Sequence, residues 1–163
     1  MTEPVIVGRL VLYDDEAIMH WVIARVKGLM GREPRNLYTS IGVVNGDYHL
    51  IAGVVYHNYT GVDIEATMAA DDPRWAMPGT LRALFAYPFQ TLRVKRMTCM
   101  VDEPNVRCRR FLEGCGFKLE GVHPLAFDGV TAMVSYGLLE PDLIYRTRAS
   151  DGQEELAASA SCA

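Results

Sequence analysis

The segment from Asn105 to Phe117 constrains the fold of this chain most. It follows the apolar run Met97–Val101 and leads into a short extended stretch, Phe117–Gly121. Asn105 comes directly after a proline, where asparagine is a good helix N-cap, and Gly116 is a typical C-terminal stop. The pattern therefore predicts a strand, a short helix and another strand in direct succession.

The residues before this segment alternate between extended and helical patterns. Apolar, β-branched runs predict strands, and apolar positions at three- and four-residue intervals predict a helix after a pair of aspartates. Asn45-Gly46 separates two apolar runs and predicts a hairpin, while Pro88 is expected to kink a second helix near Tyr87. The predicted elements are a strand over Val5–Tyr13, a helix over about Glu16–Met30, strands over Tyr38–Val44, Tyr48–His57 and Val62–Ala69, and a helix over Thr80 to about Leu92.

The rest of the chain completes a mixed sheet. Further strands are predicted over Arg96–Val101, Phe117–Phe127 and Thr131–Leu139. Helices between strands in the second half imply parallel pairing there, and the hairpins imply antiparallel pairing elsewhere. We therefore expect an α/β fold with a mixed, mostly antiparallel sheet of about seven strands flanked by helices. Residues 1–140 are expected to form one domain, and residues 141–163 a largely flexible C-terminal extension.

Composition argues against several classes of function. The 163 residues carry a formal net charge of −4, which disfavours nucleic-acid binding. No long apolar run predicts a membrane span, and the N-terminus lacks the pattern of a signal peptide. The four cysteines show no Cys-x-x-Cys spacing, so we expect neither zinc nor any other metal site. These features fit a cytoplasmic protein.

A helix that starts at Asn105, followed by Gly116-Phe117 and then Glu120-Gly121, resembles the C-terminal half of the GNAT superfamily of N-acetyltransferases. The resemblance implies a GNAT fold, acetyl-CoA as cosubstrate, and a helix that flanks the thiol end of the bound cofactor. The segments Tyr87–Phe89 and Arg74-Trp75 are similar to a divergent branch of the superfamily found in phage and prophage genomes.

The stretch Arg74–Thr80 lies between a predicted strand and a predicted helix, where main-chain N–H groups can bind a pyrophosphate. By the resemblance, Arg74 and Gly79 match the first and last positions of the family's phosphate loop. Met77 replaces its middle glycine, and Pro78 lacks an N–H group. A guanidinium from Arg74 or Arg82 could compensate for a missing amide. The alternative is a plain turn with solvated arginines.

The resemblance also implies further cofactor contacts. The pantetheine arm would lie along Met68, Ala69 and Ala70, whose small side chains allow a close approach; these could equally be ordinary strand residues. Arg109 belongs to a basic turn that could meet the ribose phosphate or simply face solvent. The predicted cofactor-binding residues are Met68, Ala69, Ala70, Arg74, Trp75, Ala76, Met77, Gly79, Thr80, Arg82, Asn105 and Arg109.

Four residues are candidates for proton transfer. Glu65, a carboxylate between apolar neighbours in a predicted central strand, is a candidate general base, although it could instead face solvent. His57 is a rival base. Many relatives carry a tyrosine on the helix where this chain has Leu112, so the donor to the departing thiolate is open between Cys108 and Tyr136. A purely structural role is the alternative for both.

The leading hypothesis is an N-acetyltransferase that moves an acetyl group from acetyl-CoA to a primary amine by direct transfer in a ternary complex. The acceptor would be a small molecule, a protein N-terminus or a lysine. The alternative is a catalytically inactive GNAT-fold module that binds CoA or a protein partner. A structural domain without a CoA site is a third reading, and a homodimer is compatible with the sequence.

Overall fold

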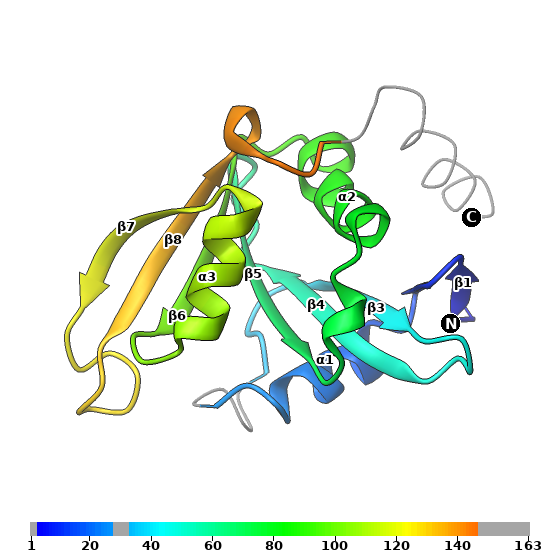
Figure 1. Cartoon of the computed structure of the whole chain (residues 1–163), viewed down its shortest axis with the longest axis horizontal. Coiled ribbons are helices and arrows are strands. Elements are labelled where there is room, and N and C mark those ends of the chain that lie inside the picture. The colour runs from blue at the N-terminus through cyan, green and yellow to red at the C-terminus, as the bar shows by residue number, and fades with distance from the viewer. Residues whose placement is uncertain (1–2, 28–32, 147–163) are drawn as a thin grey trace.

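The computed structural model describes residues 3–27 and 33–146 (Figure 1). An eight-stranded sheet runs through it in the order β1-β2-β3-β4-β5-β6-β8-β7, and its neighbouring strands are antiparallel except for β5 and β6. The strands are β1 (Val5–Val7), β2 (Leu10–Leu12), β3 (Thr39–Val44), β4 (Leu50–His57), β5 (Asp63–Ala70), β6 (Arg96–Asp102), β7 (Lys118–His123) and β8 (Met133–Leu139). The α-helices are α1 (Asp15–Ile23), α2 (Pro78–Ala86) and α3 (Val106–Cys115). The predicted mixed, mostly antiparallel α/β fold is confirmed.

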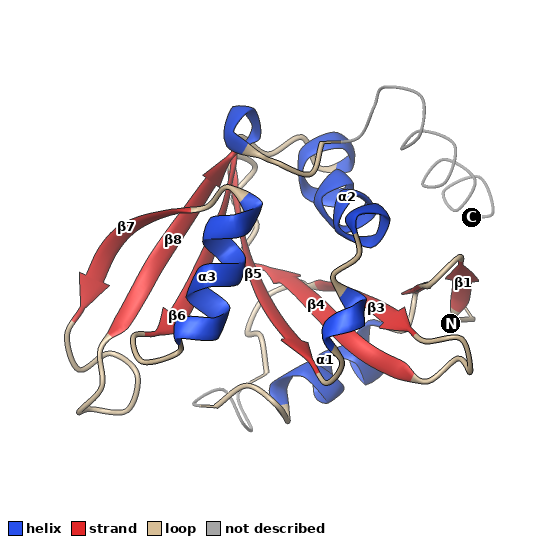
Figure 2. Ribbon diagram, in the orientation of Figure 1, coloured by secondary structure: helices blue, strands red, loops and turns tan. Residues whose placement is uncertain are grey.

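Helices cover both faces of the sheet (Figure 2). Val54 and Tyr56 of β4 lie in the same core as the buried residues of α2 and α3. Val55, between them, packs against α1 on the opposite face. This alternation follows from the two-residue period of a strand, because successive side chains point to opposite faces.

Helix α1 lies unusually close to the sheet. A Cβ atom added at Gly53 of β4 would lie 2.8 Å from Cγ2 of Val22, and one at Gly42 of β3 would lie 3.2 Å from Cδ1 of Ile18. Both distances are shorter than ordinary carbon contacts. The two glycines therefore allow the helix to pack directly on the backbone of the central strands.

The predicted first strand, Val5–Tyr13, is wrong in one respect. The structure divides it into β1 and β2, which pair with each other from Val5↔Leu12 to Val7↔Leu10. Gly8, at the turn, has a φ of +60°, a backbone conformation that glycine adopts without steric cost. The resulting hairpin raises the number of strands from the expected seven to eight.

Two predicted helices also change. The first ends at Ile23 instead of near Met30, and residues 28–30 of the prediction lie outside the described residues. The second begins at Pro78, and its α-helical part ends at Ala86. A π-helical turn, Tyr87–Thr91, follows, in which the N–H of Leu92 donates to the carbonyl of Tyr87 over 3.0 Å. Pro88 has no N–H group for an α-helical bond, which confirms the predicted break near Tyr87.

The end of the sheet is shorter than predicted. β7 stops at His123 rather than Phe127, because the chain turns back through Asp128, whose Oδ1 accepts from the N–H of Val130 over 2.9 Å. After β8, a 3-10 turn (Glu140–Asp142) leads to Ile144, whose N–H donates to the carbonyl of Cys115 over 3.2 Å. The start of the predicted extension thus packs on the end of α3, and its residues 147–163 lie outside the described part of the chain.

Candidate functional site

The two parallel strands at the centre of the sheet separate along their length. β5 and β6 pair at only three positions, of which Glu65↔Thr98 is the last. Beyond it, β5 continues to Ala70 while paired only with β4, and β6 continues to Asp102 while paired only with β8. Figure 2 shows the two strands diverging toward their C-terminal ends. We call this opening the β5–β6 divergence.

The divergence exposes one backbone edge of β5. In the described part of the chain, no strand pairs with the β6-facing edge of this strand beyond Glu65. The predicted pantetheine contacts Met68, Ala69 and Ala70 lie on that length, and their other edge pairs with β4. Unpaired backbone groups of this kind can accept a further extended chain as a partner.

Apolar side chains fill the divergence on the α2 and α3 side. A small apolar pocket there is lined by Met68 of β5, Met97 of β6 and residues of α2. Trp75 and Phe111 also line it, and their ring centroids lie 5.3 Å apart. Trp75 is only 8% exposed. The sequence predicts Trp75 as part of a phosphate loop. In the structure its indole points from that loop into the protein and packs against Phe111 of α3.

The first part of the predicted phosphate loop satisfies its own N–H groups. It contains a short 3-10 turn, η1 (Pro73–Trp75), capped by Asp72. The N–H of Arg74 donates to Oδ1 of Asp72 over 2.9 Å, that of Trp75 to the carbonyl of Asp72 over 3.1 Å, and that of Ala76 to the carbonyl of Pro73 over 3.3 Å. The main-chain N–H groups of Trp75 and Ala76 are therefore already engaged within the loop.

The start of α2 keeps free donors. The first N–H groups of a helix have no carbonyl partner within it, and here they belong to Gly79 and Thr80 because Pro78 has none. Met77 is the N-cap, and the first α-helical bond runs from the N–H of Leu81 to its carbonyl over 2.9 Å. A Cβ at Gly79 would meet no atom within 4 Å, so this helix start opens to solvent. Arg82 is exposed one turn further on.

Arg74 and a second arginine beside the loop, Arg9, are both held by neighbouring groups. The guanidinium of Arg74 forms an ion pair with Asp72, with Nη2 at 2.5 Å from Oδ2. This contact lowers the pKa of Asp72 to about 2, chiefly through its side-chain hydrogen bond to Arg74. Arg9 lies in the turn between β1 and β2, within the stretch Val5–Tyr13 that the sequence predicts as one strand, so the sequence gives no sign that it reaches this loop. Its Nη1 donates to the carbonyl of Arg74 over 3.4 Å, and its Nε to the carbonyl of Val44 over 3.0 Å. The Gly8-Arg9 pair was the only local signal of that turn.

Helix α3 has the predicted boundaries. Oδ1 of Asn105 accepts from the N–H of Cys108 over 3.1 Å, which confirms the N-cap. Gly116 has a φ of 108° and ends the helix in the left-handed conformation. Leu112 is fully buried in the core. The helix begins at the C-terminal end of β6, so its first turn flanks the β5–β6 divergence.

The two predicted proton donors differ in their surroundings. Tyr136 is fully buried beneath α3, and its hydroxyl donates to Oε1 of Glu113 over 2.8 Å while it accepts from Nε of Arg109 over 3.1 Å. β6 separates its strand, β8, from β5. Burial raises the pKa of the Cys108 thiol to about 11, so this half-buried group stays protonated at neutral pH.

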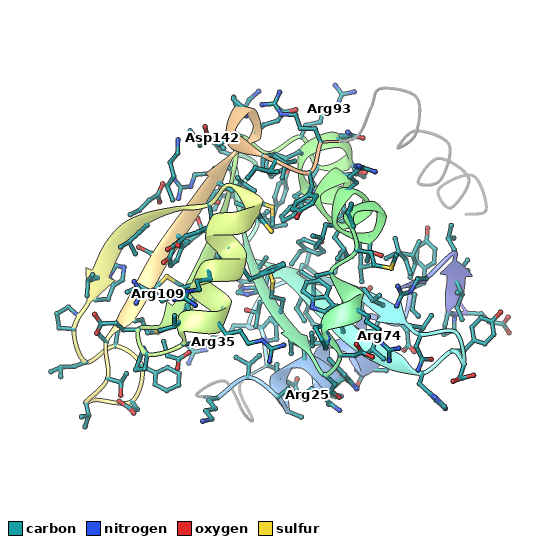
Figure 3. The ribbon with its side chains drawn as sticks, viewed as in Figure 1. Arg25, Arg35, Arg74, Arg93, Arg109 and Asp142 are labelled. Carbon is teal, nitrogen blue, oxygen red and sulfur yellow. The ribbon has the colours of Figure 1, made fainter. Side chains whose placement is uncertain are left out.

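Arg109 lies away from the phosphate loop. Besides Tyr136, it donates from Nη1 to the carbonyl of Glu103 over 2.9 Å. Figure 3 shows Arg109 on the side of α3 away from Arg74. The structure therefore does not bring Arg109 together with Arg74, and its guanidinium ties α3 to β8 in the free protein.

Glu65 lies at the closed end of the divergence, on the face that carries α1. Its neighbours Ile64 and Ala66 point into the core on the other face. His57 is its cross-strand partner, with Nδ1 3.9 Å from Oε2 of Glu65 and side-chain exposures of 17% and 36%. Nε2 of His57 hydrogen-bonds Oγ1 of Thr67 over 2.9 Å. Burial lowers the pKa of His57, and the charge of Glu65 offsets part of that shift.

Among residues 3–27 and 33–146, no group of three or more His, Cys, Asp or Glu side chains is arranged to hold a metal ion. In the same ranges, no helix is both long and apolar enough to cross a membrane.

A scan of protein-family models gives no match to this chain, and a search of curated proteins gives none either. Solved structures do resemble it. A mutant form of the spermidine/spermine N-acetyltransferase SpeG from Vibrio cholerae superposes with a TM-score of 0.59 at 19% identity, over 70% of this chain and 74% of that one. The same enzyme in complex with manganese ions gives a TM-score of 0.58 at 18% identity, over 81% and 93%. A probable acetyltransferase gives 0.57 at 21% identity, over 66% and 64%. At these identities the likeness establishes the fold, which is the GNAT acyltransferase fold.

Proposed function

We propose that this chain is an acetyl-CoA-dependent N-acetyltransferase, which acts by direct transfer to a primary amine in a ternary complex. The β5–β6 divergence carries the proposal, because it leaves the edge of β5 beyond Glu65 without a pairing strand. The pantetheine arm of CoA has amide groups of its own and can use that edge at Met68, Ala69 and Ala70 as an added strand would. The fold shared with known acetyltransferases supports the assignment.

The pyrophosphate of CoA would bind at the start of α2. The N–H groups of Gly79 and Thr80 and the dipole of the helix favour an anion there. The guanidinium groups of Arg74 and Arg82 would add charge-assisted hydrogen bonds. One edge of this proposed pyrophosphate site would be formed by Trp75, Ala76 and Met77. Asn105 would set the start of α3 beside the thiol end of the cofactor.

The chemistry requires an amine, a base and a leaving thiolate. The amine nitrogen attacks the thioester carbonyl, the new C–N bond forms, and the C–S bond breaks to release CoA as a thiolate. Glu65 would take the proton that the amine loses, directly or through water. Positioning of the two reactants and polarisation of the carbonyl by backbone N–H groups would supply most of the rate enhancement.

A proton donor for the departing thiolate is harder to assign. The hydroxyl of Tyr136 is engaged by Glu113 and Arg109 beneath α3, so we propose a structural role for it. Cys108, in the first turn of α3, remains the candidate donor, and its thiol is protonated at neutral pH.

The acceptor is proposed to be a small-molecule amine. Spermidine and spermine are named for a solved structure that shares the fold, which makes spermidine the first acceptor to test. One of those enzymes is described as dodecameric, and self-association of this chain, with a homodimer as the smallest form, is proposed by analogy. Protein N-termini and lysines remain open as acceptors. A cytoplasmic location, where acetyl-CoA is available, and the phage or prophage branch both stay predictions.

Calorimetric titration of the purified protein with acetyl-CoA tests the proposal first. We expect micromolar binding that weakens in Arg74→Ala, with Arg93→Ala as a matched control on the surface beyond α2. Release of free thiol in the presence of spermidine, or of a panel of primary amines, then tests transfer. Binding without transfer to any amine would favour the inactive CoA-binding module, and no binding near millimolar acetyl-CoA would overturn the acetyltransferase assignment.

A further inference from the structure

The loop between β5 and α2 occupies the proposed acyl-donor site itself. We propose that residues Asp72–Met77, here called the strap, are an autoinhibitory segment that must move before acetyl-CoA binds. In the strap, Trp75 fills space that the pantetheine arm needs. Asp72 forms an ion pair with the guanidinium of Arg74, which would otherwise bind a phosphate of the cofactor. The inference rests on the proposed function, because it concerns the same site.

Trp75 lies on the α2 and α3 side of the β5–β6 divergence. Its indole lines one pocket with Met68 and Met97, which belong to the two strands that separate there. On the α3 side it packs against the ring of Phe111, with centroids 5.3 Å apart and planes at 46°. An arm that hydrogen-bonds the free edge of β5 has to pass between the same two strands. The indole and an arm that enters from the α2 and α3 side therefore exclude each other.

Asp72 acts on Arg74 as an internal anion. Its carboxylate accepts from Nε of Arg74 over 2.9 Å and from Nη2 over 2.5 Å, and it also accepts from the main-chain N–H of the same residue. A planar guanidinium binds a carboxylate and a phosphate with the same pair of N–H groups. Arg74 can thus offer this pair of N–H groups to the cofactor only after it leaves Asp72.

The buried indole of Trp75 holds the strap to the core, and few polar contacts from outside add to it. Arg9 donates to the carbonyl of Arg74 over 3.4 Å and approaches Sδ of Met77 to 2.9 Å. The Arg74 side chain is 81% exposed, and inside the strap Asp72 caps the 3-10 turn by accepting from the N–H of Arg74. A ligand that binds only the displaced form has its apparent affinity reduced by the fraction of molecules in that form. The strap would therefore weaken acetyl-CoA binding without touching the reacting groups.

Tryptophan fluorescence reports the movement directly. The chain has two tryptophans, so Trp21→Phe leaves Trp75 as the only emitter. We expect the emission of Trp75 to shift to the red, and its quenching by acrylamide to increase, as acetyl-CoA saturates the site. Calorimetry on the same variant measures saturation independently of the fluorescence.

A pair of neighbouring aspartates gives a matched comparison. Asp72→Asn keeps an oxygen to cap the 3-10 turn but removes the charge that holds Arg74. Asp71→Asn makes the same change one residue away, where the carboxylate instead binds Nε of Arg25 over 2.9 Å. We expect Asp72→Asn to tighten acetyl-CoA binding by about tenfold and Asp71→Asn to change it by less than about twofold. Thermal melts confirm that each variant is folded.

The outcomes distinguish failure of the autoinhibitory strap from failure of the proposed acetyltransferase function. A red shift together with tighter binding in Asp72→Asn supports the strap, and so does binding seen in this variant but not in the wild type. Binding with an unchanged Trp75 spectrum and equal affinities overturns the strap and leaves the acetyltransferase proposal intact. No binding to the wild type or to Asp72→Asn near millimolar acetyl-CoA overturns both.

Discussion

Glu65 and His57 face each other across neighbouring strands, with the carboxylate 3.9 Å from Nδ1 of the imidazole. The other imidazole nitrogen of His57 is bound to Thr67, which leaves Glu65 as the more exposed member of the pair. Glu65 also belongs to the last residue pair before β5 and β6 separate. A proton acceptor at this position can reach an amine that approaches the divergence from the face of α1.

Replacing Glu65 therefore tests the proposed base. We expect Glu65→Gln to lower acetyl transfer by about 10²–10⁴-fold, the usual contribution of a general base, with no change in acetyl-CoA affinity. Steady-state kinetics with an accepted amine and calorimetry on the same sample measure both. Glu120→Gln is the control. Glu120 lies on β7 of the same sheet, and its Oε2 forms an ion pair with Nη2 of Arg96 at 2.6 Å. Full activity of Glu65→Gln across the pH range would rule out its role as base.

Tyr136→Phe should affect stability and not catalysis. The variant removes a hydroxyl that links Glu113 and Arg109 beneath α3, and a hydrogen bond to a charged group contributes about 1.5–3 kcal/mol. We expect the free energy of unfolding to fall by about that amount in urea titrations. A folded variant with transfer reduced a hundredfold or more would instead restore the hydroxyl as the proton donor.

Gly79→Val should separate cofactor binding from folding. A Cβ at Gly79 meets no atom within 4 Å, so the free protein has room for a larger side chain. The branched side chain would stand beside the N–H groups that we propose for the pyrophosphate. We expect acetyl-CoA affinity to fall by about tenfold, or about 1.4 kcal/mol, while the thermal midpoint stays the same. An unchanged affinity would move the phosphate site elsewhere.

Gly53→Ala should destabilise the fold because α1 packs directly on the backbone of β4 at this glycine. The added Cβ would lie 2.8 Å from Val22 and 3.1 Å from Ile18. Overpacking of this kind costs about 1–3 kcal/mol. Denaturant titration measures the loss, and Gly46→Ala is the control, since a Cβ there meets no atom within 4 Å. Equal stability of the two variants would show that α1 adjusts easily.

His57 should make stability depend on pH. Burial lowers the pKa of His57 in the folded state below its ordinary value of 6.5, so the unfolded chain binds the proton more tightly. The stabilisation is present above pH 6.5 and is lost as the pH falls through the folded-state pKa. His57→Gln should therefore flatten the loss of stability between neutral and mildly acidic pH, measured by denaturant titration at each pH. A parallel decline in both proteins would exclude His57 as its source.

Local signals account for the parts of the site that were predicted well. The caps of α3 at Asn105 and Gly116 depend on side chains and φ angles within one short segment, and the structure confirms both. The break at Pro88 follows from one missing N–H group. The β1–β2 hairpin was missed because Gly8 alone marks its turn between two strongly β-forming runs.

Long-range contacts account for what was not predicted. The sequence placed Trp75 near a phosphate because its stretch partly matches a family pattern, and Arg109 because an arginine fork suits phosphate geometry. Their actual positions depend on partners far along the chain, Phe111 for the indole and Tyr136 for the guanidinium. Arg74 and Asp72 are two residues apart, so their ion pair is local. The sequence alone does not tell whether the guanidinium of Arg74 binds this carboxylate or stays available for a phosphate.

The short contact between β5 and β6 divides the sheet into two antiparallel parts, β1–β5 and β6–β8, which share only three paired positions. A bound pantetheine arm would stand where those strands no longer meet and so would join the two parts. The substrate would then be a structural member of the protein as well as its reactant. Amide hydrogens of the two parts should exchange with solvent independently in the free protein and together once the donor is bound.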